Sequence, residues 1–219
     1  MTGRTLAPMA SAATAAALML AACDDSERDG TARPAAVRAP APTPAQGMPR
    51  KRPRGVVENC SSRSEAGFPS AFSDPANVVV GPLVLVGAAD TPPETVREFG
   101  GDKIPALVRA GHRVTVALPR RVRPFAGLGY GPLPEGVELS PRDGHRVVTF
   151  IACRRGKRSG STAGREPVTF WSGFVLTASP RCLPLEVWVD DERSPRRTSL
   201  RMGVPRRSAA TRFMSSPCT

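Results

Sequence analysis

Aromatic residues, lysine and histidine are all scarce in this chain of 219 residues. It has one Tyr, two Trp, eight Phe and two His, and only three of its 31 basic residues are Lys. Surfaces that bind nucleic acid usually interleave aromatic side chains with basic ones, so the formal net charge of +12 does not indicate a nucleic-acid partner. If the protein lies on the outer face of a membrane, this positive charge would interact with anionic lipid headgroups or wall polymers instead.

Sequence motifs of catalytic and cofactor sites are also missing. There is no Gly-x-Ser-x-Gly, no Ser-x-x-Lys and no Lys-Thr-Gly. With two His and no Cys-x-x-Cys, we predict no metal site. The stretch Gly127-Leu-Gly-Tyr-Gly-Pro132 lacks a following helix that could hold a phosphate, so we interpret it as a loop. His112 and His145 each precede an expected strand and are expected to be structural. The sequence therefore predicts no catalytic residue and no cofactor.

One short motif predicts where the protein is located. Leu20-Ala-Ala-Cys23 closes an apolar run that starts at Leu6, after a short positive segment, Met1–Arg4. The motif resembles the lipobox of bacterial lipoproteins, and this resemblance implies a signal peptide over residues 1–22 and a lipid on the Cys23 sulfur. The alternatives are an ordinary cleaved signal peptide with a coincidental Cys, or a cytosolic N-terminus. We expect an extracytoplasmic protein anchored to the outer face of the cytoplasmic membrane.

Four cysteines remain if Cys23 carries a lipid, and an even number in an oxidising compartment predicts disulfides. Loop-closure entropy favours pairing Cys153 with Cys182, which leaves Cys60 for Cys218. A simple hairpin between their strands would instead put Cys153 and Cys182 at opposite ends of a sheet. The pairing therefore stays open at this point.

Residues 23–54 are predicted to be a disordered, Pro/Ala-rich tether because nothing in them has a period that could bury a face. The segment starts acidic and ends in the basic cluster Arg50-Lys51-Arg52-Pro53-Arg54. We expect this cluster to be solvated, with contact to a membrane surface as the alternative.

Residues 55–203 have the pattern of short strands separated by Gly/Pro turns, which predicts an all-β fold, an antiparallel β-sandwich braced by disulfides. Gly81-Pro82 interrupts the first strand and indicates a bulge or an edge position. Pro93–Phe99 is the only helical candidate, and residues 204–219 form a tail that carries Cys218. Immunoglobulin-like topology is an analogy only. The expected strands are Val78–Val86, His112–Leu118, Arg146–Cys153, Val168–Thr177, Leu183–Val189 and Arg197–Met202.

Several segments resemble a group of exported β-rich proteins from high-GC actinobacteria. The similarity covers roughly residues 58–203 and implies an exported β-rich domain, but it carries over no catalytic residue. The segments that resemble the group are Cys60–Glu65, Val78–Gly87, Val168–Leu176 and Val187–Glu192.

Trp188 is the candidate for ligand binding, because alternation places it beside Glu186 and Asp190 on the face opposite a Leu/Val ladder. An exposed Trp flanked by carboxylates could stack on a sugar. The favoured interpretation is that this face packs under a loop or covers Gly173. Asp190-Asp191-Glu192 could bind Ca²⁺, but salt bridges to Arg193, Arg196 and Arg197 are favoured.

These observations predict a binding or structural module rather than an enzyme. Its partners would be the membrane, through the lipid, and a cell-wall polymer or another surface protein. The alternative is an enzyme acting on wall glycan or peptide through a dispersed site around Trp188 and Glu186, which would need a second carboxylate roughly 5–10 Å away.

Overall fold

The computed structural model describes residues 51–136, 138–154, 161–205 and 218. The chain divides into two units, Met1–Ala45 and Gln46–Thr219. Cys23, the predicted signal peptide and the tether up to residue 50 lie outside the described residues. Within the described ranges, no helix has the length and apolar character needed to cross a membrane.

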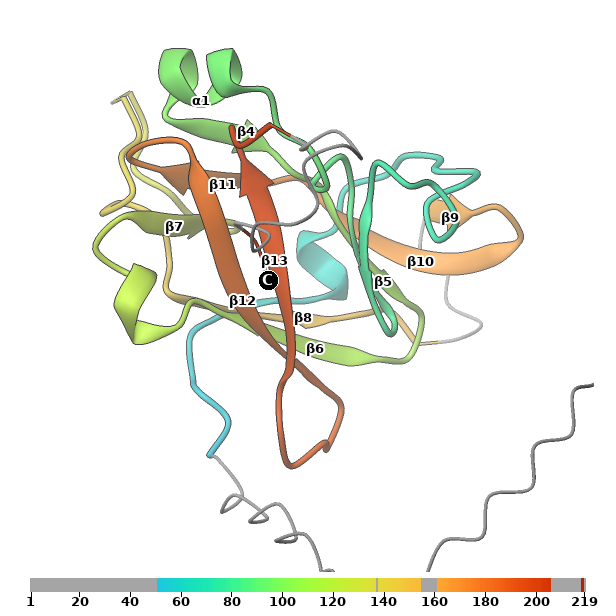
Figure 1. Ribbon diagram of the computed structural model, residues 1–219. Coiled ribbons are helices and arrows are strands. Elements are labelled where there is room, and N and C mark those ends of the chain that lie inside the picture. Colours follow the sequence, from blue (N-terminus) through green and yellow to red (C-terminus); the bar gives the residue numbers. More distant parts are fainter. Residues whose placement is uncertain (1–50, 137, 155–160, 206–217, 219) are drawn as a thin grey trace, which may run out of the picture. The chain divides into compact units, whose positions relative to one another are not determined.

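Strands make up most of the regular secondary structure in the unit from Gln46 to Thr219 and form three sheets (Figure 1). Sheet A has the order β1-β8-β6-β12-β13 and is antiparallel except for its β1–β8 pair, which is parallel. Its strands are β1 (Val56–Glu58), β8 (Val147–Ile151), β6 (Arg113–Ala117), β12 (Arg181–Val189) and β13 (Arg196–Met202).

Sheets B and C are antiparallel and continue into each other. The chain passes from β4 to β5 and from β10 to β11 through two-residue bends, and Ile104 N donates to Gly173 O (2.9 Å) between the bends. Sheet B consists of β2 (Val78–Val80), β3 (Leu83–Leu85), β5 (Ala106–Arg109), β10 (Glu166–Trp171) and β9 (Ser161–Ala163), in that order. Sheet C consists of β4 (Gly101–Lys103), β11 (Phe174–Thr177) and β7 (Ala126–Gly129).

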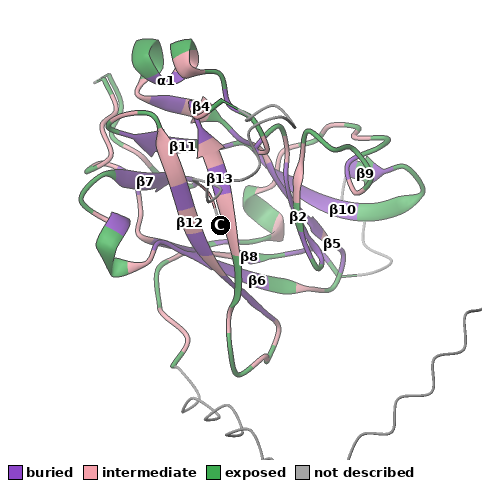
Figure 2. Ribbon diagram, in the orientation of Figure 1, coloured by how far each residue is buried: buried purple, intermediate pink, exposed green. Residues whose placement is uncertain are grey.

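The main core lies between sheet A and the combined sheets B and C (Figure 2). Alternation along β12 turns Leu183, Leu185, Val187 and Val189 inward, as the sequence pattern predicts. An aromatic stack completes the core, with Phe150 between Tyr130 and Trp171 at centroid distances of 5.0 and 5.1 Å. A smaller cluster covers the other face of sheet B, where Phe68 packs edge-on against Phe170. The sandwich-like, all-β class predicted from the sequence is therefore confirmed.

Three short helices accompany the strands in the described part of the chain. The α-helix α1 (Pro93–Phe99) is the predicted one, with Pro93 in its first turn and Gly100 ending it in a left-handed conformation (φ 65°). The other two are the 3₁₀ turns η1 (Cys60–Ser62) and η2 (Arg120–Val122).

Three local predictions were wrong. The expected single strand Val78–Val86 is a β2–β3 hairpin whose turn is Gly81-Pro82, with Gly81 at φ 59°. The predicted bulge is therefore wrong, but the alternative edge position is confirmed, because β2 lies at a sheet edge. The run Val168–Thr177 is two strands in two sheets, separated at Ser172-Gly173. The predicted loop at Gly127 begins inside β7, where a side chain would meet the Pro141 carbonyl oxygen at 2.6 Å. The parallel β1–β8 pair and the merged sheets also depart from immunoglobulin topology.

Candidate functional site

The four cysteines of the folded unit form two disulfides, Cys60–Cys153 and Cys182–Cys218. The pairing favoured by loop entropy, Cys153 with Cys182, is wrong. The parallel register puts Glu58 beside Phe150, so the chain after β1 brings Cys60 to Cys153, with 4.8 Å between their Cα atoms. Cys182 lies at the far end of β12, because it is Val189 that shares a row with Phe150 through Val114. Cys182 and Val189 are seven strand residues apart, which corresponds to about 23 Å.

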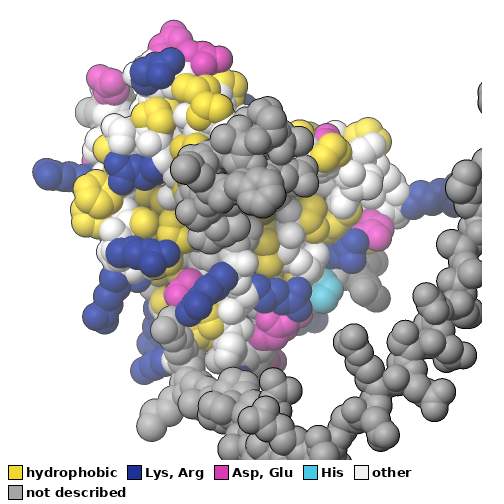
Figure 3. Space-filling view, in the orientation of Figure 1, with side chains coloured by type: hydrophobic (Ala, Val, Ile, Leu, Met, Phe, Trp, Pro, Cys, Tyr) yellow, Lys and Arg dark blue, Asp and Glu magenta, His cyan; other side chains and the backbone are white. Residues whose placement is uncertain are grey.

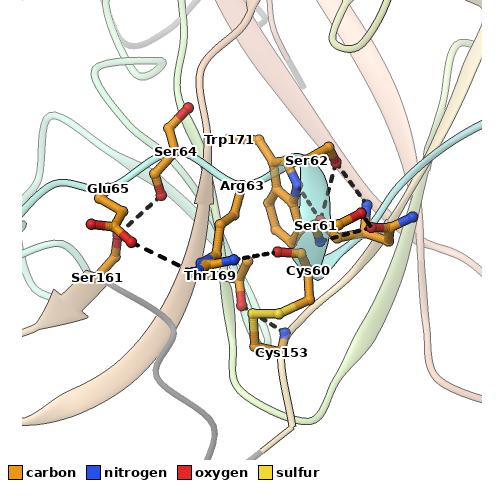
Figure 4. The surroundings of a disulfide bond; sticks show 11 residues. Cys60, Ser61, Ser62, Arg63, Ser64, Glu65, Cys153, Ser161, Thr169 and Trp171 are labelled. Carbon is orange, nitrogen blue, oxygen red and sulfur yellow. Dashed lines mark hydrogen bonds and ion pairs between the residues drawn. A yellow bond between two sulfur atoms is a disulfide. The ribbon is translucent and has the colours of Figure 1, made fainter.

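The Cys60–Cys153 bridge lies in a packed, hydrogen-bonded environment (Figure 4). Cys153 is buried, and its backbone N–H donates to Thr169 Oγ1 (2.8 Å). Arg63 Nη1 donates to Cys60 O (2.9 Å), and the indole N–H of Trp171 donates to Asn59 O (3.1 Å). The bridge therefore joins β1 and η1 to the core.

Trp188 is buried, with 2% of its surface exposed. The interpretation of Trp188 as an exposed sugar-stacking platform is therefore wrong. It shares the outer face of sheet A with its register partner Thr115, which is fully buried. Trp188 does not cover Gly173, because the space beside that glycine is filled by the Tyr130 ring. The Trp188 indole N–H has no hydrogen-bond partner among the described residues.

Asp190 joins the end of β12 to the start of β6 through hydrogen bonds. Its carboxylate contacts His112 Nδ1 (2.8 Å) and accepts from Arg113 N (2.9 Å), and its own N–H donates to Arg113 O (2.8 Å). Burial alone would raise the pKa of Asp190, but the hydrogen bonds from Arg113 and His112 together lower it. No described Ser, Thr or Cys side chain hydrogen-bonds to His112, so the pair is not extended into a catalytic triad.

The carboxylates of Asp191 and Glu192 form ion pairs with arginines, which the sequence favours over Ca²⁺ binding. Glu192 pairs with Arg196, and Asp191 pairs with Arg113 (3.2 Å), which the sequence analysis did not name. No cluster of three or more His, Cys, Asp or Glu side chains that could hold a metal occurs in the described part of the chain.

Glu186 lies in a groove of about 320 Å³ on the outer face of sheet A. The groove's charged lining consists of Glu186 and three arginines, of which Arg197 is the register partner of Glu186 across the β12–β13 pair. The other two, Arg120 and Arg121, come from η2. Glu186 is the only carboxylate among the described lining residues, so these residues do not supply the carboxylate pair that glycoside hydrolysis needs.

A second groove, of about 440 Å³, lies over β1, β8 and β6 on the same face of sheet A. Val57, Thr149 and Thr115 are direct register partners and form its floor. Arg113 and the segment before β1 supply its basic side chains, which are Lys51, Arg52, Arg54 and Arg113. Register places Trp188 next to Thr115, so the two grooves lie on one continuous sheet face.

We call this surface the basic face and define it by the cationic side chains of the two grooves. Among the described residues, only Arg113 has a carboxylate partner, Asp191. From its sequence, the cluster before β1 is expected to be solvated, with contact to a membrane surface as the alternative, and no local pattern predicts a role for Arg120 and Arg121. The Arg-Arg pair at 120–121 was visible in the sequence, but only strand register could place it beside Arg197. The members of the basic face are Lys51, Arg52, Arg54, Arg113, Arg120, Arg121 and Arg197.

A third groove, of about 430 Å³, lies between α1 and sheet C. Its exposed hydrophobic walls are Phe99 and Phe174, with 66% and 40% of their surfaces accessible. Its one carboxylate, Asp102, accepts a hydrogen bond from Thr91 Oγ1 (2.9 Å). The described lining residues of these three grooves therefore include no pair of carboxylates for acid–base chemistry.

We compared the chain with family models, curated proteins and solved structures. No family model matches the chain, and neither the curated proteins nor the solved structures gave a match.

Proposed function

We propose that this protein is a lipid-anchored, extracytoplasmic lipoprotein that presents its β-rich unit as a binding module. The observation that carries the proposal is the cysteine pairing. Four of the five cysteines are joined in two disulfides, which form and persist in oxidising compartments outside the cytosol. The remaining cysteine is Cys23, the one that follows Leu20-Ala-Ala. Acylation would account for the one cysteine that these two disulfides leave over.

Binding is favoured over catalysis by the side chains in the grooves. The candidate enzyme site needed an accessible Trp188 and a second carboxylate near Glu186. Trp188 is buried, and Glu186 is surrounded by arginines in its groove. The cations of the basic face, most of which have no carboxylate partner in the described part of the chain, suit the recognition of an anionic partner.

Metabolic labelling with a palmitate analogue in a bacterial host tests the anchor. We expect the wild-type chain to be labelled and the Cys23→Ala variant to be unlabelled. The Cys182→Ala/Cys218→Ala double variant is the matched control, because it loses two cysteines but keeps Cys23, and it should stay labelled. A wild-type chain without label, or a Cys23→Ala variant that keeps it, would overturn the anchor.

A further inference from the structure

The basic face concentrates positive charge on one side of sheet A. Six of its seven cationic side chains have no ion-pair partner among the described residues, and the seventh, Arg113, contacts an Asp191 side chain that is 95% exposed. Figure 3 shows Lys and Arg side chains gathered at the lower left of the view, around η2 and β12, with few Asp or Glu side chains between them. Unpaired cations on one face attract an extended anionic surface more strongly than scattered charges do.

Exposed aliphatic side chains lie on the same face. Val57 has 51% of its surface accessible, and Ile151, the register partner of Arg113, has 40%. The only aromatic residue on the outer face of these strands is Trp188, which is buried and cannot stack on a base or a sugar. Cations beside exposed aliphatic groups suit the boundary of a bilayer, where guanidinium groups meet phosphates and short apolar side chains enter the interface.

The direction of the chain also favours a bilayer. Lys51, Arg52 and Arg54 are the last cationic residues before β1, and they line the groove over β1, β8 and β6. The chain that leads back to Cys23 therefore leaves the folded unit on its basic face. If Cys23 is anchored, the tether joins the unit at its basic face, and this step rests on the proposed function.

We propose that the basic face docks the β-rich unit onto the anionic phospholipid surface of the membrane. Each Lys or Arg near such a surface strengthens binding by roughly fivefold at physiological ionic strength. Docking would hold the unit against the bilayer and limit the reach of the tether.

The test uses residues 46–219, which contain both disulfides and every described core residue. Binding is measured by co-sedimentation with vesicles of phosphatidylcholine alone and of phosphatidylcholine with 30% phosphatidylglycerol. We expect binding to the anionic vesicles only, weakening as salt is raised. The Arg120→Gln/Arg121→Gln/Arg197→Gln variant should bind roughly a hundredfold more weakly.

A matched variant separates position from total charge. Arg97, Lys103 and Arg165 are exposed and lie on α1, on β4 and in the β9–β10 turn, away from the basic face. Their triple Gln variant has the same net charge as the first triple variant and should keep wild-type binding. Equal loss in both variants, or binding without preference for the anionic vesicles, would overturn the docking face.

Val57→Ser separates a bilayer from a soluble polyanion. We expect it to weaken vesicle binding several-fold and to leave binding of inorganic polyphosphate unchanged. If polyphosphate competes fully with the vesicles and Val57→Ser changes neither, the partner is a polyanion and the bilayer proposal fails. Residues 46–219 lack Cys23, so the vesicle result and the palmitate-labelling result can fail independently.

Discussion

At the scale of single residues, the two tryptophans form a natural pair for comparison. Both are buried, with 1% and 2% of their surfaces exposed, but only the indole N–H of Trp171 has a described partner, the Asn59 carbonyl. A buried donor without a partner is unfavourable by about 1–3 kcal/mol. Trp171 therefore contributes a hydrogen bond in addition to packing, and Trp188 contributes packing alone.

Substituting each Trp with Phe should separate these contributions. Trp171→Phe loses indole volume and leaves the Asn59 carbonyl without its donor, so we expect the free energy of unfolding to fall by about 2–3 kcal/mol. Trp188→Phe loses the same volume but removes an unpartnered N–H, so we expect a loss smaller by about 1–2 kcal/mol. Urea unfolding, compared at unchanged m-values, measures both. Equal losses would show that the Trp188 N–H is satisfied in solution.

Asp190 combines backbone strain with charge. It is the only described non-glycine residue with a positive φ (41°), a conformation that Asp and Asn tolerate better than most residues. Its carboxylate is held by Arg113 and His112, which explains why the chain adopts this conformation at the end of β12.

Asp190→Asn should remove a pH-dependent part of the stability while keeping the backbone conformation. The pKa of Asp190 is lowered below the ordinary 3.8, because the hydrogen bonds from Arg113 and His112 outweigh the opposing effect of burial. A lowered pKa stabilises the fold above 3.8, and this contribution disappears as the pH falls through the folded-state value. We expect wild type to exceed the variant by about 1 kcal/mol at pH 5, since the side chain is nearly half exposed, and the difference to shrink as the pH falls below 3.8. Denaturant unfolding across this range measures it, and a constant difference would contradict the prediction.

At the scale of elements, the bend at Ser172-Gly173 decides how sheets B and C meet. The Tyr130 ring fills the space beside Gly173, and its hydroxyl donates to Ile104 O (2.6 Å) at the other bend. Burial raises the pKa of Tyr130 well above its ordinary value, which keeps this donor protonated. The two bends and the ring between them therefore form one packed corner.

Gly173→Ala should disrupt that corner. The new methyl group would overlap the buried Tyr130 ring, which is packed against Phe150 and cannot move without disturbing the core. We expect a loss of about 3 kcal/mol in the free energy of unfolding.

Gly67→Ala is the control for this substitution, because no atom lies within 4 Å of its added methyl group. It should change the stability by no more than about 0.5 kcal/mol, as other surface substitutions do. Thermal or urea unfolding of both variants measures the difference. A Gly173→Ala variant as stable as the control would show that the corner can relax.

The elements predicted most accurately from the sequence are those with an undisturbed local pattern. The alternation over Leu183–Val189 predicts both the strand and the inward face of β12, and Pro93–Phe99 predicts α1 because its end residues and Gly100 act locally. The run Val168–Thr177 looks continuous because a bend at one glycine leaves the surrounding β-forming residues unchanged. Only the packing of Tyr130 against Gly173 reveals that two sheets meet there.

At the scale of the whole molecule, the disulfides follow from topology rather than from sequence distance. Cys60 and Cys153 are 93 residues apart, and loop entropy alone would disfavour joining them. The parallel β1–β8 pair overrides that preference because it brings the two cysteines together as the sheet forms. The second bridge ties Cys218, near the end of the chain, to the start of β12.

The basic face is a property of the same scale. Its cationic side chains come from the segment before β1, from β6, from η2 and from β13, so no sequence window contains them together. A net charge of +12 predicts that such a surface exists, but only the order β1-β8-β6-β12-β13 decides that the charges gather on one side of sheet A.

The sequence by itself determined the all-β class, the short helix and the fact that all four cysteines of the folded unit are in disulfides, because period-2 alternation, turn residues and an even cysteine count act locally or by number. It also carries the prediction of an anchor at Cys23, which depends on a short motif. Tertiary structure decided which cysteines pair, that Trp188 is buried, and that two groups of arginines share one face. These properties depend on strand order and register, and they are set by contacts between residues far apart in the chain, where local patterns carry no information.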